Sequence, residues 1–284
     1  MRLSELGELG LLAELERRGL AEQIEHDAAE LEPGLVVTQD SLVEDVHFRL
    51  DWLSWRELGF RAAAVNISDL SASGARPEAL LVSLGLPGKT ELDDVLALYE
   101  GLAEAGVTVR GGDTSESAVV FATVTALGRA ERVPGRSGAR PGDQVVVTGP
   151  LGAAGAAFRD DRFVRPPLRV EEGIELARDA HAMIDLSDGL ARDAGHIAAR
   201  SGCRLAIDLE RVPLAPGATH EDLAFGEDYE LLAATPEPRE FAVVGVCEIG
   251  VGVELRSGGR RVCDLGAWEH FRARTCTSRR EPRT

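Results

Sequence analysis

Residues 184–190 read IDLSDGL, and they follow a short apolar run that predicts a β-strand. Alternation along a strand would place Asp185 and Ser187 on one side. Asp188 would stand at the start of the next helix, where backbone N–H groups favour anions. One carboxylate there would be an ordinary helix cap, but two within four residues repel each other, at a cost that a bound cation would remove. The segment therefore predicts a metal site where a strand meets a helix.

Four more aspartates stand at the ends of other predicted elements. They are Asp27, Asp40 at the end of a short apolar strand, Asp69 in the last turns of an Ala-rich helix over residues 54–74, and Asp113. Taken singly, each has an ordinary interpretation as a cap or a helix end turned to water. Taken together they predict hard-cation chemistry, because magnesium takes oxygen ligands and usually binds through a few carboxylates plus substrate phosphates.

Three further patterns have both a functional and an ordinary interpretation. Gly111 and Gly112 precede Asp113 after a predicted strand, and they would let the backbone of a turn approach a phosphate, although a plain turn uses the same residues. Residues 226–230, GEDYE, enter a strand, and composition alone favours a solvated charge run. His47 is as often a core or surface histidine as a substrate contact.

Length and composition predict a globular chain of two domains. The chain has 284 residues, of which 44% are hydrophobic and 28% charged, and this length exceeds that of a usual single core. Gly, Pro and Arg concentrate in residues 132–143, which we take as the boundary. The predicted domains are residues 1–134 and 135–271, followed by a polar, basic tail over 272–284 that we expect to be disordered.

The formal net charge of −17 argues against nonspecific binding to nucleic acid or to an anionic membrane, since both need a basic face. No apolar run approaches the roughly 20 residues of a spanning helix, and the N-terminal segment reads as an amphipathic helix. We therefore expect a soluble cytoplasmic protein. Its four cysteines lack CxxC spacing, which favours buried thiols over disulfides or a zinc site.

Seven ordered stretches together resemble one family, the thiamine-monophosphate kinases, within the superfamily of ATP-binding aminoimidazole ribonucleotide synthetases and selenophosphate synthetases. In chain order the stretches are Asp27-Ala28-Ala29, residues 38–43 with His47-Phe48, residues 64–70, 111–114, 135–143, 184–190 and 226–231. They extend over nearly the whole chain. The pair IDLSDGL and GEDYEL is similar to this kinase rather than to its superfamily relatives.

The resemblance implies an α/β fold with α+β mixed sheets, in a two-domain aminoimidazole ribonucleotide synthetase-like architecture that forms a homodimer. It implies transfer of the ATP γ-phosphoryl group to thiamine monophosphate, with several Mg²⁺ ions. Because a phosphate acceptor is already largely deprotonated near neutral pH, we expect direct transfer without a phosphoenzyme. The implied metal ligands are Asp27, Thr38, Gln39 through its backbone, Asp40, Asp69, Asp113, Asp185 and Asp188. The implied ATP contacts are Gly112, Asp113, Arg136 and Ser187, and the implied thiamine contacts are His47, Glu227 and Trp268. A cationic thiazolium is attracted to a carboxylate and to an aromatic face.

The chain departs from the family pattern at two motifs, and its connections near residues 155–165 and 215–225 look short. Glu25 and His26 stand where the family has Gly and Asp, and Gln39 replaces the more usual Thr. These changes affect the expected number of metal ions more than the reaction class, because Asp27 and Asp40 remain. Two alternatives stay open: another ATP-using enzyme of the superfamily, or a non-catalytic paralogue that binds nucleotide and thiamine phosphate.

Overall fold

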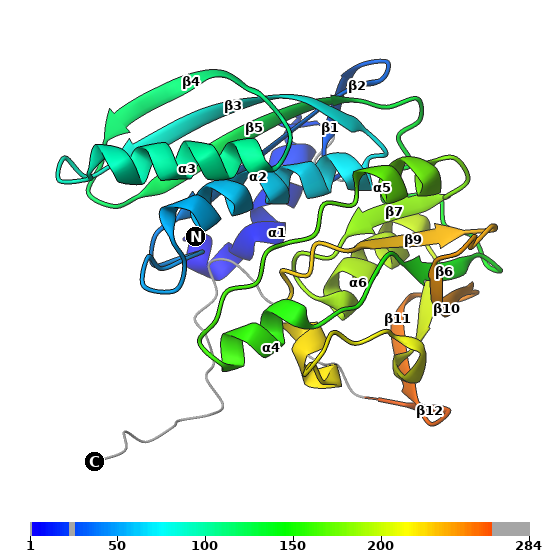
Figure 1. The fold of residues 1–284 in the computed structure, drawn as a ribbon. Coiled ribbons are helices and arrows are strands. Elements are labelled where there is room, and N and C mark those ends of the chain that lie inside the picture. The colour runs from blue at the N-terminus through cyan, green and yellow to red at the C-terminus, as the bar shows by residue number, and fades with distance from the viewer. Residues whose placement is uncertain (1, 23–25, 263–284) are drawn as a thin grey trace.

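The structure is a computed structural model that describes residues 2–22 and 26–262. It contains two β-sheets, each packed with helices (Figure 1). Both sheets are mixed, because β3 pairs parallel with β4 in one and β8 pairs parallel with β11 in the other, while the remaining pairs are antiparallel. The predicted fold class, α/β with mixed sheets in two domains, is confirmed. In the described part of the chain, no helix has the length and apolar character needed to cross a membrane.

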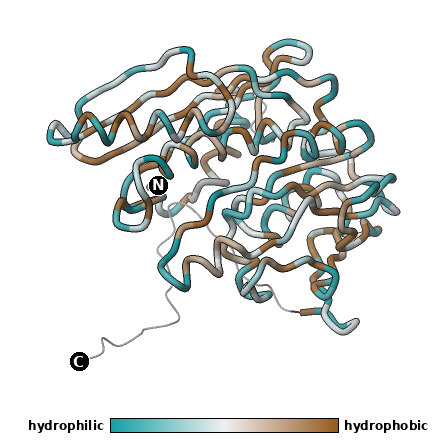
Figure 2. The backbone as a smooth tube through the Cα atoms, viewed as in Figure 1, coloured by the Kyte–Doolittle hydropathy of each residue, from teal (hydrophilic) through white to brown (hydrophobic). Residues whose placement is uncertain are grey.

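The first sheet has the strand order β1-β2-β5-β3-β4. Its strands are β1 (Ala29–Glu32), β2 (Leu35–Val43), β3 (Arg76–Leu86), β4 (Val109–Glu116) and β5 (Phe121–Arg129). The helices of this half are α1 (Leu3–Arg17), α2 (Trp55–Ala72) and α3 (Leu92–Glu104). In Figure 2 the tube alternates between teal and brown through α3, as expected for a helix with one buried face.

The second sheet has the order β12-β11-β8-β10-β6-β9-β7. Its strands are β6 (Gln144–Val147), β7 (Ala182–Asp185), β8 (Arg204–Asp208), β9 (Leu231–Thr235), β10 (Ala242–Glu248), β11 (Gly252–Ser257) and β12 (Arg260–Arg261). The helices are α4 (Ala153–Arg159), α5 (Val170–Ala177) and α6 (Leu190–Ser201), with 3-10 turns η1 (Leu209–Arg211) and η2 (His220–Ala224). Both faces of this sheet are covered. Val145 and Val147 pack in the core formed with α6, whereas Val146 packs in the core that contains Leu176 of α5.

Helix α2 lies between the two halves of the molecule. Fourteen of its 18 residues are buried. Ala63 and Ile67 belong to the core of the first sheet, whereas Ala72 belongs to a core that also contains Met183 of β7. Helix boundaries follow the sequence: the Ser54 hydroxyl accepts a hydrogen bond from the Glu57 N–H at the N-terminus, and Gly74 follows the C-cap with φ +67°. An Ala-rich helix suits this position because small side chains let other elements approach on several sides.

Replacing Gly59 should weaken the packing of α2 against α3. A Cβ atom at this position would lie 1.9 Å from the carbonyl oxygen of Leu98, so the helices would have to separate. We expect Gly59→Ala to lower the free energy of unfolding by about 1–3 kcal/mol. The matched control is Gly195→Ala in α6, where the nearest atom would be 4.0 Å away, so the change should be neutral or stabilising by up to about 1 kcal/mol. Urea unfolding of both variants compares them, and equal losses would contradict the close-packing explanation.

Candidate functional site

Three carboxylates meet between the two sheets. Asp27 precedes β1, Asp69 lies in the last turn of α2, and Asp185 ends β7. Each offers an oxygen atom, and these three atoms lie within 4.8 Å of one another. Segments far apart in the sequence therefore converge on one point, and α2 supplies the residue that connects the two halves.

Short hydrogen bonds fix this cluster on its supporting elements. The Thr38 hydroxyl of β2 donates to Asp69 at 2.6 Å, and the Ser68 hydroxyl of α2 donates to Asp185 at 2.7 Å. The backbone N–H of Asp40 donates to the Asn66 side chain at 3.0 Å. Alternation along β2 thus turns Thr38 and Asp40 toward α2. All of these donor and acceptor atoms lie on regular elements, so the arrangement is rigid.

Burial and mutual repulsion disfavour ionisation in this cluster. Burial raises the pKa of Asp69 well above its ordinary value, and the nearby carboxylate of Asp40 raises it further. The pKa of Asp185 rises to about 8, first because the group is buried and then because Asp27 lies close. Burial also raises the pKa of Asp40 and of Asp27, although Asp40 as a whole residue is exposed to solvent. A bound cation would remove this repulsion.

Arg136 supplies the cationic partner of Asp27. Its Nε donates to Asp27 Oδ1 at 3.2 Å, and a second guanidinium nitrogen bonds the same oxygen. Arg136 follows Gly135, whose φ is +68° and whose missing Cβ would lie 2.5 Å from the His26 ring. The predicted ATP contact therefore borders the carboxylate cluster directly.

Asp188 stands at the start of helix α6, as expected, but it is not the residue that caps this helix. Helix α6 begins at Leu190 with Gly189 as the N-cap. The carboxylate at this helix end is that of Asp193, which accepts from the backbone N–H groups of Asp188 and Gly189 at 3.0 and 3.1 Å. Asp188 instead lies 3.3 Å from Arg192 Nε. Asp188, Asp193 and His196 bring ligand atoms within 4.8 Å of one another, and burial lowers the pKa of His196 to about 4.

The acidic segment 226–230 is not a solvated charge run. Asp228 is buried and accepts from the Gly152 N–H through both oxygens, at 2.9 and 2.8 Å, at the start of α4. Glu230 is buried and forms a two-point pair with Arg169, at 2.7 Å for each contact. Composition could not reveal these roles because the partner groups lie about 60 to 76 residues away in the sequence.

The segment 226–230 packs directly on the segment 184–190. The Glu227 N–H donates to the Ser187 carbonyl at 2.8 Å, and the Tyr229 N–H donates to the Leu186 carbonyl at 2.9 Å. Gly226 has φ +80°, and a Cβ there would lie 2.3 Å from the Ser187 oxygen. The two motifs that most resembled the kinase family therefore form one structural unit.

Two of the three predicted thiamine contacts, Glu227 and His47, share a hydrogen-bond partner on α2. Glu227 Oε1 accepts from Arg61 at 2.5 Å, and the His47 carbonyl accepts from the same guanidinium at 2.8 Å. The His47 ring accepts a hydrogen bond at Nδ1 from the Val43 N–H at 3.0 Å, which leaves Nε2 to carry the proton of the neutral ring. Trp268, the third predicted thiamine contact, lies outside the described residues.

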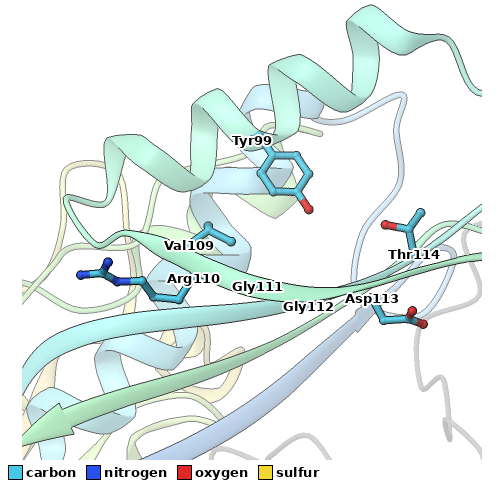
Figure 3. Close-up of a pocket in the computed structure, with 7 residues that line it drawn as sticks. All are labelled: Tyr99, Val109, Arg110, Gly111, Gly112, Asp113 and Thr114. Carbon is cyan, nitrogen blue, oxygen red and sulfur yellow. The ribbon is translucent and has the colours of Figure 1, made fainter.

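The sequence suggested a turn at residues 111–114. In the structure these residues, Gly111, Gly112, Asp113 and Thr114, instead belong to strand β4. Gly112 is required by packing, because a Cβ atom there would lie 1.7 Å from the Val82 carbonyl oxygen of β3. Figure 3 shows that Gly112 and Asp113 line an open pocket beneath Tyr99 of α3. Asp113 is exposed and stands apart from the cluster of Asp27, Asp69 and Asp185.

Gln39 is the other predicted ligand that points away. Its side-chain oxygen accepts from the Thr125 hydroxyl of β5 at 2.8 Å, on the opposite side of β2 from Thr38 and Asp40. Only its backbone could serve the cluster, as the family resemblance implies.

Sequence reasoning missed Ser68 and Arg61 as site residues. Both are buried in α2, at 2% and 4% relative exposure. A signal existed for Arg61, since it is a single charge within the apolar run of residues 58–65. Ser68 carried no such signal, because serine is common on either face of a helix.

Comparison with known proteins identifies the family. The family models of AIR synthase related protein match in two parts, the N-terminal domain over residues 25–130 and the C-terminal domain over residues 140–251. The thiamine-monophosphate kinase of Aquifex aeolicus (strain VF5) is 34% identical over 310 aligned positions, which cover 95% of this chain and 100% of that protein. The chain belongs to the thiamine-monophosphate kinase family. It is therefore a kinase, and the family resemblance seen in the sequence is confirmed.

Further relatives agree with this membership. The thiamine-monophosphate kinase of Methanopyrus kandleri is 36% identical over 81% of this chain and 84% of that protein. The solved structure of AaThiL complexed with AMPPCP and TMP matches the present structure with a TM-score of 0.87. The two chains are 34% identical, and the match covers 95% of this chain and 99% of that one. The HypE-HypF complex matches at 18% identity and a TM-score of 0.73, which shows the shared fold alone.

The metal-free protein should lose stability as the pH rises from about 4 to about 8. The pKa of Asp185 is about 8 in the folded chain, against an ordinary value of 3.8. Between these values the folded state holds a proton that the unfolded state releases, so rising pH favours unfolding. Thermal unfolding in EDTA across this range measures the effect. Added magnesium should restore the lost stability. A thermal midpoint that magnesium leaves unchanged would contradict a cation site here.

Asp185→Asn should stabilise the metal-free protein at pH 8. The substitution removes the buried charge, and the Ser68 hydroxyl can still donate to the amide oxygen, so we expect a gain of roughly 1–3 kcal/mol. The variant should also lose most of its stabilisation by magnesium. Asp45→Asn, at an exposed position, is the matched control and should change neither quantity. Equal magnesium shifts in the two variants would remove Asp185 from the proposed ligand set.

Proposed function

We propose that this chain catalyses ATP-dependent phosphorylation of thiamine monophosphate, giving thiamine diphosphate and ADP. The observation that carries the proposal is the convergence of Asp27, Asp69 and Asp185 beside Arg136, next to a separate pair formed by Glu227 and Arg61. One region thus suits polyphosphate and the other a cationic organic group. Family membership supports both assignments, since the AaThiL structure holds AMPPCP and TMP.

The carboxylate cluster fits magnesium. Its candidate ligands are all oxygen atoms, as magnesium prefers. One oxygen atom from each of three carboxylates lies within 4.8 Å of the other two, so a single ion could contact all three. The Thr38 hydroxyl donates a hydrogen bond to Asp69. We assign Asp27, Thr38, Asp40, Asp69, Asp185 and Asp188, with Asp113 and the backbone of Gln39, as the residues that would hold several ions. Magnesium, when bound, would offset the charges of the two phosphate reactants and of the transferring group.

The chain's own residues would bind and orient the reactants. Arg136 can exchange its contact with Asp27 for a nucleotide phosphate, and Ser187 lies in the same segment as Asp185 and Asp188. Glu227 and His47 would hold the cationic acceptor. A phosphate acceptor is largely deprotonated near neutral pH, so no residue needs to act as a strong base. Direct in-line transfer therefore requires no phosphoenzyme and no catalytic nucleophile.

We further propose that the kinase acts as a homodimer through its first sheet. Strand β4 stands at the edge of that sheet, and seven of its eight residues are exposed. Edge strands are normally covered or blocked. The uncovered strand carries Gly112 and Asp113, so a second copy packed near it could complete the ATP site. Thiamine monophosphate and ATP would be the small-molecule partners, without nucleic acid or membrane, in a cytoplasmic setting.

Asp40→Asn should reduce kcat at least about 100-fold, because it removes an anionic ligand at nearly equal volume. The fold should survive, since the backbone N–H of residue 40 still reaches Asn66. Asp45→Asn, which makes the same change at an exposed position five residues on, is the control and should keep wild-type turnover. Near-normal turnover in the Asp40 variant would reject its role.

Product formation tests the function as a whole. Purified protein would be incubated with ATP, magnesium and thiamine monophosphate, and thiamine diphosphate would be separated by chromatography, with an EDTA control. Magnesium-dependent thiamine diphosphate supports the proposal. Binding of both ligands without product would indicate a non-catalytic paralogue, whereas failure to bind thiamine monophosphate would indicate a different acceptor.

A further inference from the structure

Arg61 occupies a costly position for a charged residue. It lies in the second turn of α2, next to Phe60 and Ala62, and only 4% of its surface is exposed. Its Nε atom is buried and has no hydrogen-bond partner among the described residues. Burial of a guanidinium with an unsatisfied N–H is unfavourable unless its other contacts compensate. The two contacts that it does make therefore need explanation.

Those contacts join two segments that are 180 residues apart. One guanidinium nitrogen donates to the His47 carbonyl, and the other donates to Glu227 Oε1. His47 belongs to the segment after β2 in the first half of the molecule, whereas Glu227 belongs to the segment before β9 in the second half. The rigid fork of a guanidinium can hold both at once, which a lysine amine would do less well.

We propose that Arg61 is the positioning residue of the acceptor site: it fixes the Glu227 carboxylate relative to His47 so that both can hold the cationic acceptor. This inference rests on the proposed function, because it assigns Arg61 to the acceptor side of that reaction. Arg61 itself does not touch the acceptor, since its side chain is 5% exposed whereas that of Glu227 is 36% exposed. The carboxylate thus lies between the buried cation and the solvent.

The backbone of Glu227 indicates that its side-chain direction is imposed. Its φ is +58°, in the left-handed region that non-glycine residues rarely adopt. Such a conformation is energetically unfavourable and persists only where the surroundings determine it. Here the hydrogen bond from its N–H to Ser187 and the capping role of Asp228 hold the backbone, and Arg61 holds the side chain. Arg61 engages Oε1, so the carboxylate is fixed through this oxygen.

A purely structural role predicts different behaviour. If Arg61 only connected the two halves of the molecule, its loss would lower stability and affect both substrates alike. If it acts through Glu227, its loss should weaken binding of the acceptor alone, and the effect should vanish once residue 227 has no carboxylate to be positioned. A double-mutant cycle separates these cases.

The experiment compares Arg61→Gln, Arg61→Lys, Glu227→Gln and the double variant Arg61→Gln/Glu227→Gln. For each we would measure KM for thiamine monophosphate and for ATP, together with the Kd of thiamine monophosphate by calorimetry with magnesium. We expect Arg61→Gln to raise the KM for thiamine monophosphate about tenfold and that for ATP less than about twofold. Arg61→Lys should recover part of the loss. The double variant should be no more than about twofold worse than Glu227→Gln alone.

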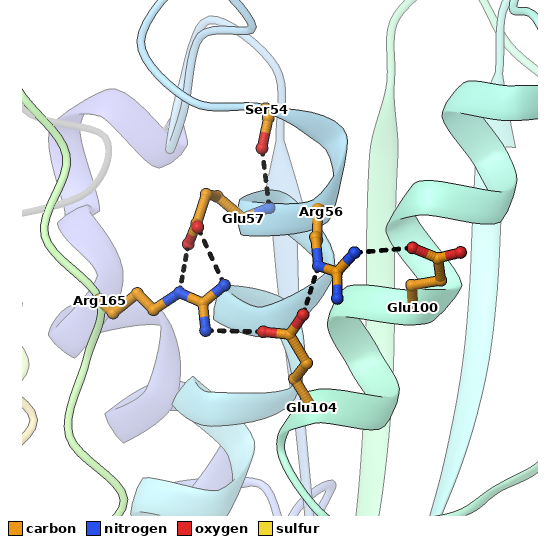
Figure 4. A network of polar contacts seen from close by, with 6 residues as sticks. All are labelled: Ser54, Arg56, Glu57, Glu100, Glu104 and Arg165. Atoms are coloured by element: carbon orange, nitrogen blue, oxygen red, sulfur yellow. Dashed lines mark hydrogen bonds and ion pairs between the residues drawn. The ribbon is translucent and has the colours of Figure 1, made fainter.

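The matched control is Arg165→Gln. Figure 4 shows that Arg165 reaches Glu57 of α2 and Glu104 of α3, through contacts of 2.7 to 2.9 Å. It therefore contacts the same helix as Arg61, one turn earlier and on a more exposed surface, without reaching Glu227. Both KM values should stay within about twofold of wild type.

Three results would overturn the inference: additive effects of Arg61→Gln and Glu227→Gln, equal increases in both KM values, or an acceptor effect of the same size in Arg165→Gln. Failure of the proposed function is distinguishable from these. If the wild-type protein binds thiamine monophosphate but makes no thiamine diphosphate, the function fails while the Kd series still decides the role of Arg61. If the wild-type protein does not bind thiamine monophosphate, both fail.

Discussion

Burial of α2 between two sheets is the constraint on which the rest of the structure depends. A helix enclosed on several sides needs small residues, and α2 is rich in alanine and supplies Gly59 where α3 approaches. The polar groups in its last turns also face both halves of the molecule rather than water. Asp69 meets Thr38 of the first sheet, and Ser68 meets Asp185 of the second. The helix is therefore both the core of the fold and the frame of the site.

The same burial produces the electrostatic character of the site. Desolvation is the leading cause of the raised pKa of Asp27, Asp40, Asp69 and Asp185. A core would normally exclude such a group of like charges. Keeping these carboxylates together on rigid elements lowers the stability of the metal-free protein. Such a cost is typical of a functional site, here one that binds cations, and this is the physical reason to connect the cluster with phosphate transfer.

The sequence predicted the fold class and the convergence of Asp27, Asp69 and Asp185, because these residues stand at element ends and the motifs occur in family order. It could not show what depends on three-dimensional partners. The sequence suggested that Asp228 is solvated, but it caps α4. It suggested that Gly112 belongs to a phosphate-binding loop, but Gly112 is needed because β3 leaves no room for a side chain there. The boundary after residue 134, the role of Trp268, the homodimer and the cytoplasmic location remain predictions.

The acidic segment 226–230 shows why composition alone misleads. Its three acids have three different partners: Arg61 for Glu227, the α4 N-terminus for Asp228, and Arg169 for Glu230. Asp228 and Glu230, which are both buried, hold the segment in place through their contacts. Only Glu227 keeps substantial exposure. A segment anchored on both sides of one accessible carboxylate presents that carboxylate at a fixed position, which is what selective binding of a small cation requires.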